Sequence, residues 1–234
     1  MKKNLLALPL LFLSFSICSI AQTADEIVAK HIEARGGLEK IRALQTLIME
    51  GSMNQGGTDV LLKYYYSNNK AAKTEFSAVG QTGYNIVTTS EGWMFNPFMG
   101  HTAAEPIPDV QLKEAQSQLD LAGPLVDYKT KGHTVEYLGK QSIQGVDYFK
   151  LKLTRANGKI STYYLDKNYL TSQVVTTQTV DGNEQEVTTE YADYRKTPEG
   201  YIFAFKRISG NNEIVFEKIE INPKIDESVF KPGN

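Results

Sequence analysis

The stretch Asp147–Arg155, DYFKLKLTR, has the two-residue period of a half-buried β-strand. Two lysines alternate with three apolar side chains that share one face, namely Phe149, Leu151 and Leu153. The pair Asn157-Gly158 follows at once, and such a pair permits the positive φ angles of a tight hairpin. This stretch therefore predicts a strand that turns back on itself in an antiparallel sheet.

Short strands and turn residues continue to alternate from His133 to Ile221. After the first strand, the pattern predicts Ile160–Leu165, Thr171–Val180, Glu186–Tyr194, Tyr201–Ile208 and Ile214–Ile221. The segments between them are rich in Gly, Asn, Asp and Pro, which favour turns. About six strands joined by short loops predict an antiparallel meander. A sheet of that length twists and curves, so its concave face needs a cover.

The N-terminal half begins with helices and then continues the sheet. Thr23 and Glu26 form a capping-box signature before a helix that ends at Gly36-Gly37, and Leu38–Leu44 predicts a second short helix. Further strands are predicted at Thr46–Met53, Val60–Tyr66, Ala72–Val79 and Tyr84–Thr89, followed by the aromatic stretch Trp93–Met99.

Pro106–Val126 is the long segment without strand character between the two halves of the sheet. Asp109 is a suitable N-cap, Gly123-Pro124 a suitable end, and apolar residues recur at helical steps, namely Leu112, Ala115, Leu119 and Ala122. The pattern predicts an amphipathic helix that covers the concave face together with the N-terminal helix. It fits plain core packing and a lid over a cavity equally well.

The first 21 residues have the form of a secretory signal peptide. Lys2-Lys3 precedes the apolar run Leu5–Ile17, and small residues precede a cleavage site before Gln22. The run is shorter than the roughly 20 residues of a membrane-spanning helix. Lipidation at Cys18 is the less favoured alternative, because the bulky Ile17 stands where a small residue is expected.

The mature chain, residues 22–234, is predicted to be a single all-β domain in the periplasm. No cysteine remains after cleavage, which fits an exported protein without disulfides. Without Lys2 and Lys3, 23 basic and 27 acidic residues remain, a net charge near −4. A mildly acidic chain without a basic cluster argues against nucleic acid as a partner.

No motif in the sequence indicates a reaction, a metal site or a cofactor. The histidines His31, His101 and His133 lack metal-ligand spacing, and His31 is interpreted as a surface or packing residue. Nucleophile elbows, phosphate loops and dinucleotide-binding turns do not occur. Carboxylates are numerous and are interpreted as a charged outer face of the sheet, among them Glu75, Asp147, Asp166, Glu184, Glu186, Glu190 and Asp193.

The segment Gly92-Trp93-Met94-Phe95-Asn96-Pro97 resembles the Trp-x-aromatic-Asp/Asn-Pro strand of the LolA/LolB-type outer-membrane lipoprotein-sorting proteins. A likeness to a divergent, largely uncharacterised branch of this family spans nearly the whole mature chain. It rests on Ala34-Arg35-Gly36-Gly37, Gly139–Val146, Tyr148–Leu151, Tyr163–Asp166 and Asn222-Pro223 with Phe230.

This resemblance implies an unclosed antiparallel barrel, a half-barrel, with a helical lid over an apolar cavity. It also implies a role in shielding lipoprotein acyl chains across the periplasm, with delivery components in the inner and outer membranes as partners. The Pro-x-x-Phe-Arg segment common in the family is replaced at Asn68–Phe76, where Asn68 and Lys73 stand instead. The broader expectation is therefore a lipidic or other apolar ligand.

We expect the cavity wall to consist of inward-facing side chains of the strands, namely Val60, Leu62, Tyr64, Tyr66, Phe76, Trp93, Phe95, Phe149, Leu151 and Leu153. Leu112, Ala115 and Leu119 would form the lid. Periodicity reports burial, so each residue fits ordinary core equally well. Two alternatives to a carrier are a secreted hydrolase with paired acids in a cleft and a ligand-free accessory or assembly domain with a filled interior.

Overall fold

The computed structural model describes residues 22–180 and 183–233. The predicted signal peptide and Cys18 lie outside the described residues, so cleavage and lipidation stay predictions. No helix within the described part of the chain is long and apolar enough to span a membrane.

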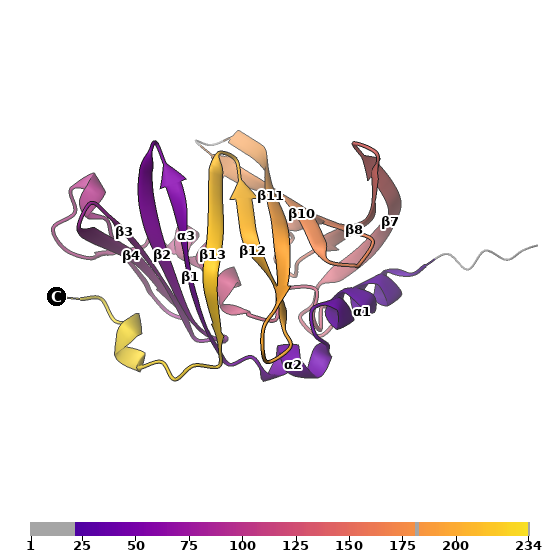
Figure 1. The fold of residues 1–234 in the computed structure, drawn as a ribbon, viewed down its shortest axis with the longest axis horizontal. Coiled ribbons are helices and arrows are strands. Elements are labelled where there is room, and N and C mark those ends of the chain that lie inside the picture. The colour runs from indigo at the N-terminus through magenta and orange to yellow at the C-terminus, as the bar shows by residue number, and fades with distance from the viewer. Residues whose placement is uncertain (1–21, 181–182, 234) are drawn as a thin grey trace, which may run out of the picture.

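The strands form one antiparallel sheet in the order β6-β5-β4-β3-β2-β1-β13-β12-β11-β10-β9-β8-β7 (Figure 1). Their bounds are β1 (Thr46–Gln55), β2 (Thr58–Ser67), β3 (Ala71–Ala78), β4 (Gln81–Thr88), β5 (Gly92–Phe95), β6 (Glu105–Pro106), β7 (Thr134–Ile143), β8 (Val146–Thr154), β9 (Ile160–Leu165), β10 (Thr171–Val180), β11 (Asn183–Lys196), β12 (Ile202–Ser209) and β13 (Asn212–Ile221). The end strands β6 and β7 are not paired with each other. The predicted fold class, a mainly β, strongly curved and unclosed antiparallel sheet, is confirmed.

The predicted meander occupies β7 to β13. Leu151 on β8 stands opposite Tyr163 on β9, and the hairpin between these strands is closed by a 2.9 Å hydrogen bond from Arg155 N–H to the Lys159 carbonyl. Gly158 has a φ of 83°, as expected of the Asn-Gly turn. With β7 included, the meander has seven strands, one more than the sequence pattern predicts.

The two halves of the sheet join where the first strand pairs with the last. The β1–β13 register shifts between Glu50 and Gly51, which marks a bulge. A Cβ atom at Gly51 would lie 2.3 Å from the Val215 carbonyl oxygen, so only glycine permits this close approach. Bulges bend a strand and increase its twist, and this one lies at the centre of the curved sheet.

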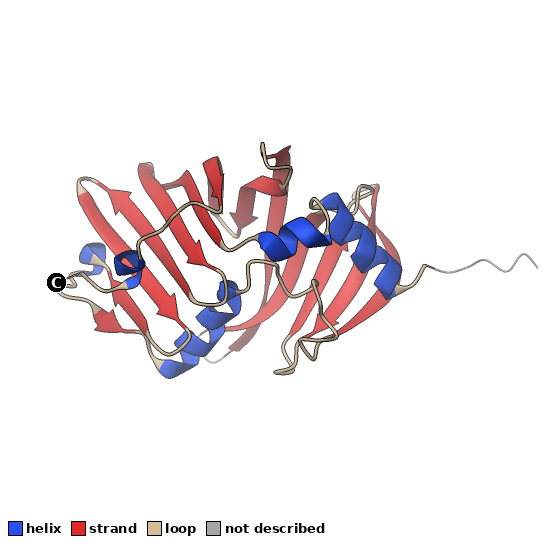
Figure 2. Cartoon of the chain, turned by 90° about the horizontal axis from the view of Figure 1, so that it is seen from below, coloured by secondary structure: helices blue, strands red, loops and turns tan. Residues whose placement is uncertain are grey.

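The α-helices lie across the concave face (Figure 2). The first two are α1 (Ala24–Ala34), with the predicted capping box between Thr23 and Glu26, and α2 (Leu38–Ala43). The inserted segment contains α3 (Asp109–Ala115) and the 3-10 helix η2 (Gln116–Leu119). Two further 3-10 helices are η1 (Pro97–Met99) and η3 (Glu227–Phe230).

The prediction of one helix over Pro106–Val126 was wrong in extent, because helical structure ends at Leu119. The turn between β2 and β3 takes over the hydrogen bonds that would continue the helix. Asn69 N–H donates to the Leu119 carbonyl at 2.7 Å, and the Asn68 side chain accepts from Leu121 N–H at 3.1 Å. Residues 120–132 therefore run as turns across the sheet.

The buried apolar side chains on the concave face form separate clusters along the sheet. At the β7–β9 end, α1 packs on the strands through Ile27 and Val28. At the β3–β4 end, Leu112 and Leu119 pack on Ala72 and Val87. Between them lies a third cluster of side chains from β2, β12 and β13, namely Val60, Leu62, Tyr64, Phe205, Ile214 and Phe216.

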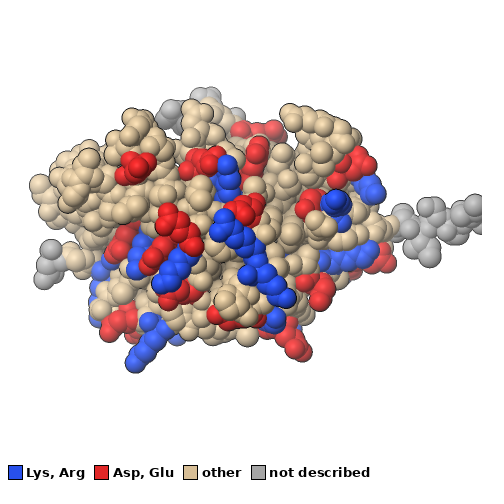
Figure 3. All heavy atoms as spheres, in the orientation of Figure 1, with Lys and Arg blue, Asp and Glu red and all other residues tan. Residues whose placement is uncertain are grey.

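Acidic and basic side chains are interspersed on the outer face of the sheet (Figure 3). Lys63 pairs with Glu50 at 2.7 Å, and Lys73 pairs with Glu75 at 2.8 Å. The mixture agrees with the interpretation of Glu75 as part of a charged outer face. The segment containing η3 packs against β3 and β4, where Gly233 N–H donates to the Tyr84 hydroxyl at 3.0 Å.

Candidate functional site

A cavity of about 470 Å³ lies between the central strands, the C-terminal end of α1 and the crossing segment at Gly123–Leu125. Five tyrosines, three arginines and one histidine contribute to its wall, together with apolar side chains such as Met49, Val174 and Phe216. Of the residues that the structure describes, no Asp or Glu lines it. The cavity is therefore amphipathic and carries positive charge.

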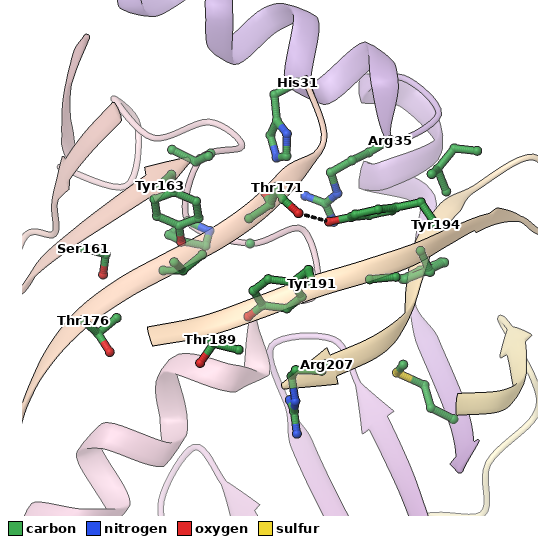
Figure 4. Close-up of a pocket in the computed structure, with 18 of the residues that line it drawn as sticks. His31, Arg35, Ser161, Tyr163, Thr171, Thr176, Thr189, Tyr191, Tyr194 and Arg207 are labelled. Carbon is green, nitrogen blue, oxygen red and sulfur yellow. Dashed lines mark hydrogen bonds between the residues drawn. The ribbon is translucent and has the colours of Figure 1, made fainter. Parts of the chain in front are cut away.

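The end of α1 brings His31 and Arg35 to the cavity, since residues four apart share one face of a helix (Figure 4). His31 is only 4% exposed, and its Nδ1 lies 2.8 Å from the Tyr169 carbonyl oxygen. Burial, and to a lesser extent the charge of Arg35, lower the pKa of His31 to about 4. The imidazole is therefore neutral at pH 7 and donates Nδ1–H to Tyr169.

The backbone around Arg35 is held on both sides. Its carbonyl oxygen accepts a 3.1 Å hydrogen bond from Ile202 N–H on β12. Gly36 follows with a φ of 115°, and a Cβ atom there would lie 2.8 Å from the Gly200 carbonyl oxygen. The Gly-Gly pair that ends α1 thus lets the helix end approach the sheet closely and fixes the position of Arg35.

The Arg35 guanidinium donates Nη1–H to the Ala122 carbonyl oxygen at 2.9 Å. Within the described part of the chain it has no ion pair, and the nearby Asp120 is paired with Lys131 at 2.6 Å. Burial lowers the pKa of Arg35, but an arginine side chain stays charged in a protein. The cavity wall thus contains a guanidinium without a carboxylate partner.

The tyrosines supply neutral hydroxyl groups. Tyr194 donates its hydroxyl hydrogen to the Thr171 carbonyl oxygen at 2.7 Å (Figure 4). Burial raises the pKa of Tyr194, and it raises the pKa of Tyr66 and of Tyr163 to about 12. These phenols remain protonated at neutral pH, so they can form hydrogen bonds but do not act as bases.

Arg207 and Arg155 approach the cavity from other directions. Arg207 stands opposite Tyr191 across β11 and β12, and its Nη2 lies 3.5 Å from the Tyr64 hydroxyl, at the limit of a hydrogen bond. Arg155 lines both this cavity and a neighbouring hollow of about 460 Å³ beside η2. Neither has an ion pair among the residues described.

The arrangement is suited to binding. The described wall lacks the pair of carboxylates that a glycosidase-type site needs, and the described residues contain no cluster of three metal-ligating side chains. Three guanidinium groups, neutral hydroxyls and an apolar surface together complement a molecule that has both a polar and an apolar part.

The structure brings two predicted wall residues, Tyr64 and Tyr66, to the cavity. The others on the concave face belong to its packed parts. Val60, Leu62 and Phe76 pack with the central cluster, and α1 fills the space over Phe149, Leu151 and Leu153. The three predicted lid residues Leu112, Ala115 and Leu119 pack on β3 and β4, outside this cavity.

Trp93 and Phe95 lie on the opposite face of the sheet, which corrects the prediction that they line the concave side. Trp93 stands opposite Ile86 and Phe95 stands opposite Tyr84, whereas Met94 faces the concave side with Asn85. A one-residue difference in phase moves every side chain of a strand to the other face. Trp93 Nε1 is buried there without a hydrogen-bond partner.

Sequence reasoning missed most of the polar wall, including Arg35, Arg155, Arg207, Tyr163, Tyr191 and Tyr194. His31, which the sequence indicates is a surface or packing residue, is buried and also lines the cavity. One signal was available, because His31 and Arg35 share a helix face immediately before the Gly-Gly end. The remaining residues become neighbours only through strand pairing.

No family model and no curated protein matches the sequence. Among solved structures, a DUF1329 family protein from Desulfovibrio piger has a TM-score of 0.60 and 11% sequence identity, covering 90% of this chain and 98% of its own. A LolA superfamily protein from Nitrosomonas europaea has a TM-score of 0.57 and 14% identity over the same shares.

A domain named for outer membrane lipoprotein sorting, from Vibrio parahaemolyticus, has a TM-score of 0.53 and 14% identity, covering 88% of this chain and 94% of its own. At these identities the likeness concerns the fold. The alignments extend over nearly the whole described chain, in agreement with the resemblance inferred from the sequence motifs. The protein therefore has the same unclosed antiparallel half-barrel fold as these three structures.

Proposed function

We propose that this protein is a periplasmic carrier that binds a lipidic ligand, either a lipoprotein acyl chain or another lipid, in the central cavity. The observation that carries the proposal is a cavity of about 470 Å³ left between the curved sheet and the crossing segment. Ligand sites in proteins typically measure about 300–1,000 Å³. A filled interior would have favoured the accessory or assembly domain.

The wall contains the apolar surface that a hydrocarbon chain needs. Met49, Phe203 and Phe216 contribute side chains from β1, β12 and β13, and Leu125 contributes one from the crossing segment. Each methylene group moved from water to such a surface contributes about 0.8 kcal/mol. Burial of a hydrocarbon chain of several carbons is therefore sufficient for binding, and a carrier of this kind needs no catalytic residue.

The fold supports the same proposal. Two of the structural neighbours are a LolA superfamily protein and a domain named for lipoprotein sorting. Delivery to the outer membrane, with partners in the two membranes, and export through residues 1–21 belong to the proposal. The described residues of the cavity wall do not supply the paired acids that the hydrolase alternative requires.

The proposal is tested by gentle purification, native mass spectrometry and lipid extraction, followed by uptake of a fluorescent fatty acid by the delipidated protein. Ala204→Trp places a large side chain in the cavity and should weaken uptake at least tenfold. Leu61→Trp is the matched control, because Leu61 is 63% exposed outside the cavity. Unfolding midpoints show whether both variants fold.

Two outcomes contradict a carrier. One is the absence of bound lipid after purification together with no uptake by the delipidated protein. The other is equal uptake by the folded Ala204→Trp and Leu61→Trp variants, which would place any bound fatty acid outside this cavity.

A further inference from the structure

We propose that the ligand is an anionic amphiphile whose carboxylate or phosphate group binds Arg35 while its hydrocarbon part occupies the apolar wall. This inference rests on the proposed carrier function and names the chemical class of the ligand.

Arg35 leaves most of its hydrogen-bond donors unused. A guanidinium has five N–H donors, and the structure assigns only Nη1 a partner, the Ala122 carbonyl oxygen. Among the described residues, Trp93 Nε1 is the one fully enclosed side-chain nitrogen or oxygen without a partner. The remaining nitrogens of Arg35 are therefore in contact with open space, and that space is the cavity.

The cavity wall carries positive charge that a bound anion would neutralise. A buried charge without a partner is unfavourable, and a bound anion removes that penalty. Arg35, Arg155 and Arg207 all line the cavity, while Asp120, the nearby carboxylate, is paired with Lys131. Because the described wall contains no carboxylate, nothing in it competes with an incoming anion for Arg35.

The surroundings of Arg35 suit an anionic head group attached to a hydrocarbon chain. Tyr194 and Tyr163 lie close to the guanidinium, and their hydroxyls remain protonated at neutral pH (Figure 4). An arginine can hold a carboxylate or phosphate with two parallel N–H bonds, which are shorter and stronger than neutral ones. The rest of the wall, at Met49 and Phe216, accommodates the hydrocarbon part.

The test uses the delipidated mature protein and three probes with the same chain, dodecanoate, dodecyl phosphate and dodecanol, titrated in a calorimeter at pH 7. Inorganic phosphate serves as a fourth titrant without a chain. We expect the two anionic amphiphiles to bind at least tenfold more tightly than dodecanol. Inorganic phosphate alone should bind far more weakly than dodecyl phosphate.

Arg35→Met should reduce the preference for dodecanoate over dodecanol to within about twofold. Lys224→Met, an exposed lysine outside the cavity, is the charge-matched control and should keep the preference. For the unmodified protein, we expect the NMR signal of Arg35 Nε–H to shift on addition of dodecanoate and not of dodecanol. This signal provides the test if Arg35→Met does not fold.

The outcomes separate the two proposals. Equal binding of dodecanol and dodecanoate would overturn the anionic class and leave the carrier intact, whereas no binding of any amphiphile would overturn both. Phosphate binding as tight as that of dodecyl phosphate would indicate a free anion as ligand. A preference that persists in folded Arg35→Met, or an Arg35 signal that does not move, would remove Arg35 from the site.

Discussion

The two helices on the concave face, α1 and α3, cover the same sheet in different ways. Ile27 on α1 is 0% exposed, and Asp25 on the same helix bonds Tyr128 and pairs with Lys129 at 2.6 Å. In contrast, α3 begins without a side-chain cap, and Val110 on it is 76% exposed. Its continuation η2 is tied to the sheet by a 3.0 Å hydrogen bond from Gln116 to the Thr88 carbonyl.

The difference indicates that α1 is an integral part of the scaffold, whereas α3 is weakly attached to the sheet. Segments with few buried contacts and exposed hydrogen bonds open locally at lower free energy than the global fold. We infer that α1 holds Arg35 and His31 in place, while α3 is the part of the cover that opens locally at lower free energy. Three predictions test this comparison.

The largest effect is expected in the core under α1. Ile27→Ala should lower the free energy of unfolding by about 3–4 kcal/mol, because it leaves a cavity in a fully packed cluster. Leu112→Ala should cost about 2 kcal/mol or less, since α3 can settle onto the sheet. Urea denaturation of both variants measures the difference. Equal losses would show that α3 is as integral to the fold as α1.

The second effect concerns His31 and the pH. Its pKa in the folded state, about 4, lies below the ordinary value of 6.5, so the unfolded chain binds more protons in between. Stability is complete above pH 6.5 and falls as the pH decreases towards 4, by about 2 kcal/mol between pH 7 and pH 5. Urea denaturation at the two pH values measures this loss.

His31→Gln is the matched variant for that experiment, because glutamine has no proton to gain in this range. Its stability should change by less than 1 kcal/mol between pH 7 and pH 5. If the wild type and His31→Gln lose the same stability on acidification, His31 is not the group that anchors α1 in a pH-dependent way.

The smallest effect is a difference in local opening. Backbone amides in α3 and η2 should exchange with deuterium at least tenfold faster than those in the middle of α1, a difference of about 1.4 kcal/mol in opening free energy. Addition of dodecanoate should slow exchange in the crossing segment. Equal protection in α1 and α3 without ligand would contradict a weakly attached cover.

The sequence patterns correctly predicted those parts of the fold that depend on residues close together in the chain. The alternation around Leu151, the capping box at Thr23 and the Asn157-Gly158 turn each depend on near neighbours, and the structure has a strand, a helix and a hairpin there. The end of the helix at Leu119 depends instead on Asn68 and Asn69. Because Asn68 and Asn69 are far from Leu119 in the chain, the residues around Leu119 alone could not predict where the helix ends.

The candidate site was less accessible to sequence reasoning for a physical reason. Periodicity selected Leu151 and Leu153 because they are apolar, but apolar side chains at that spacing are equally suited to packing under α1. The cavity wall is formed by residues such as Arg35 and Tyr194, which read as polar surface in the sequence. The side of the sheet to which Trp93 and Phe95 point depends on the register of β5 with β4, and a strand of four residues is too short to predict it from alternation.

The pairing of β1 with β13 has a consequence for how the chain acquires its shape. These strands are among the most distant in sequence, yet they join at the middle of the sheet. Pairing of distant segments is slow, because a long loop must close before the contact forms. Until the last strand is in place, β1 and β12 remain open edges able to recruit another chain, so a chaperone that shields nascent edges would protect this protein most during its final step.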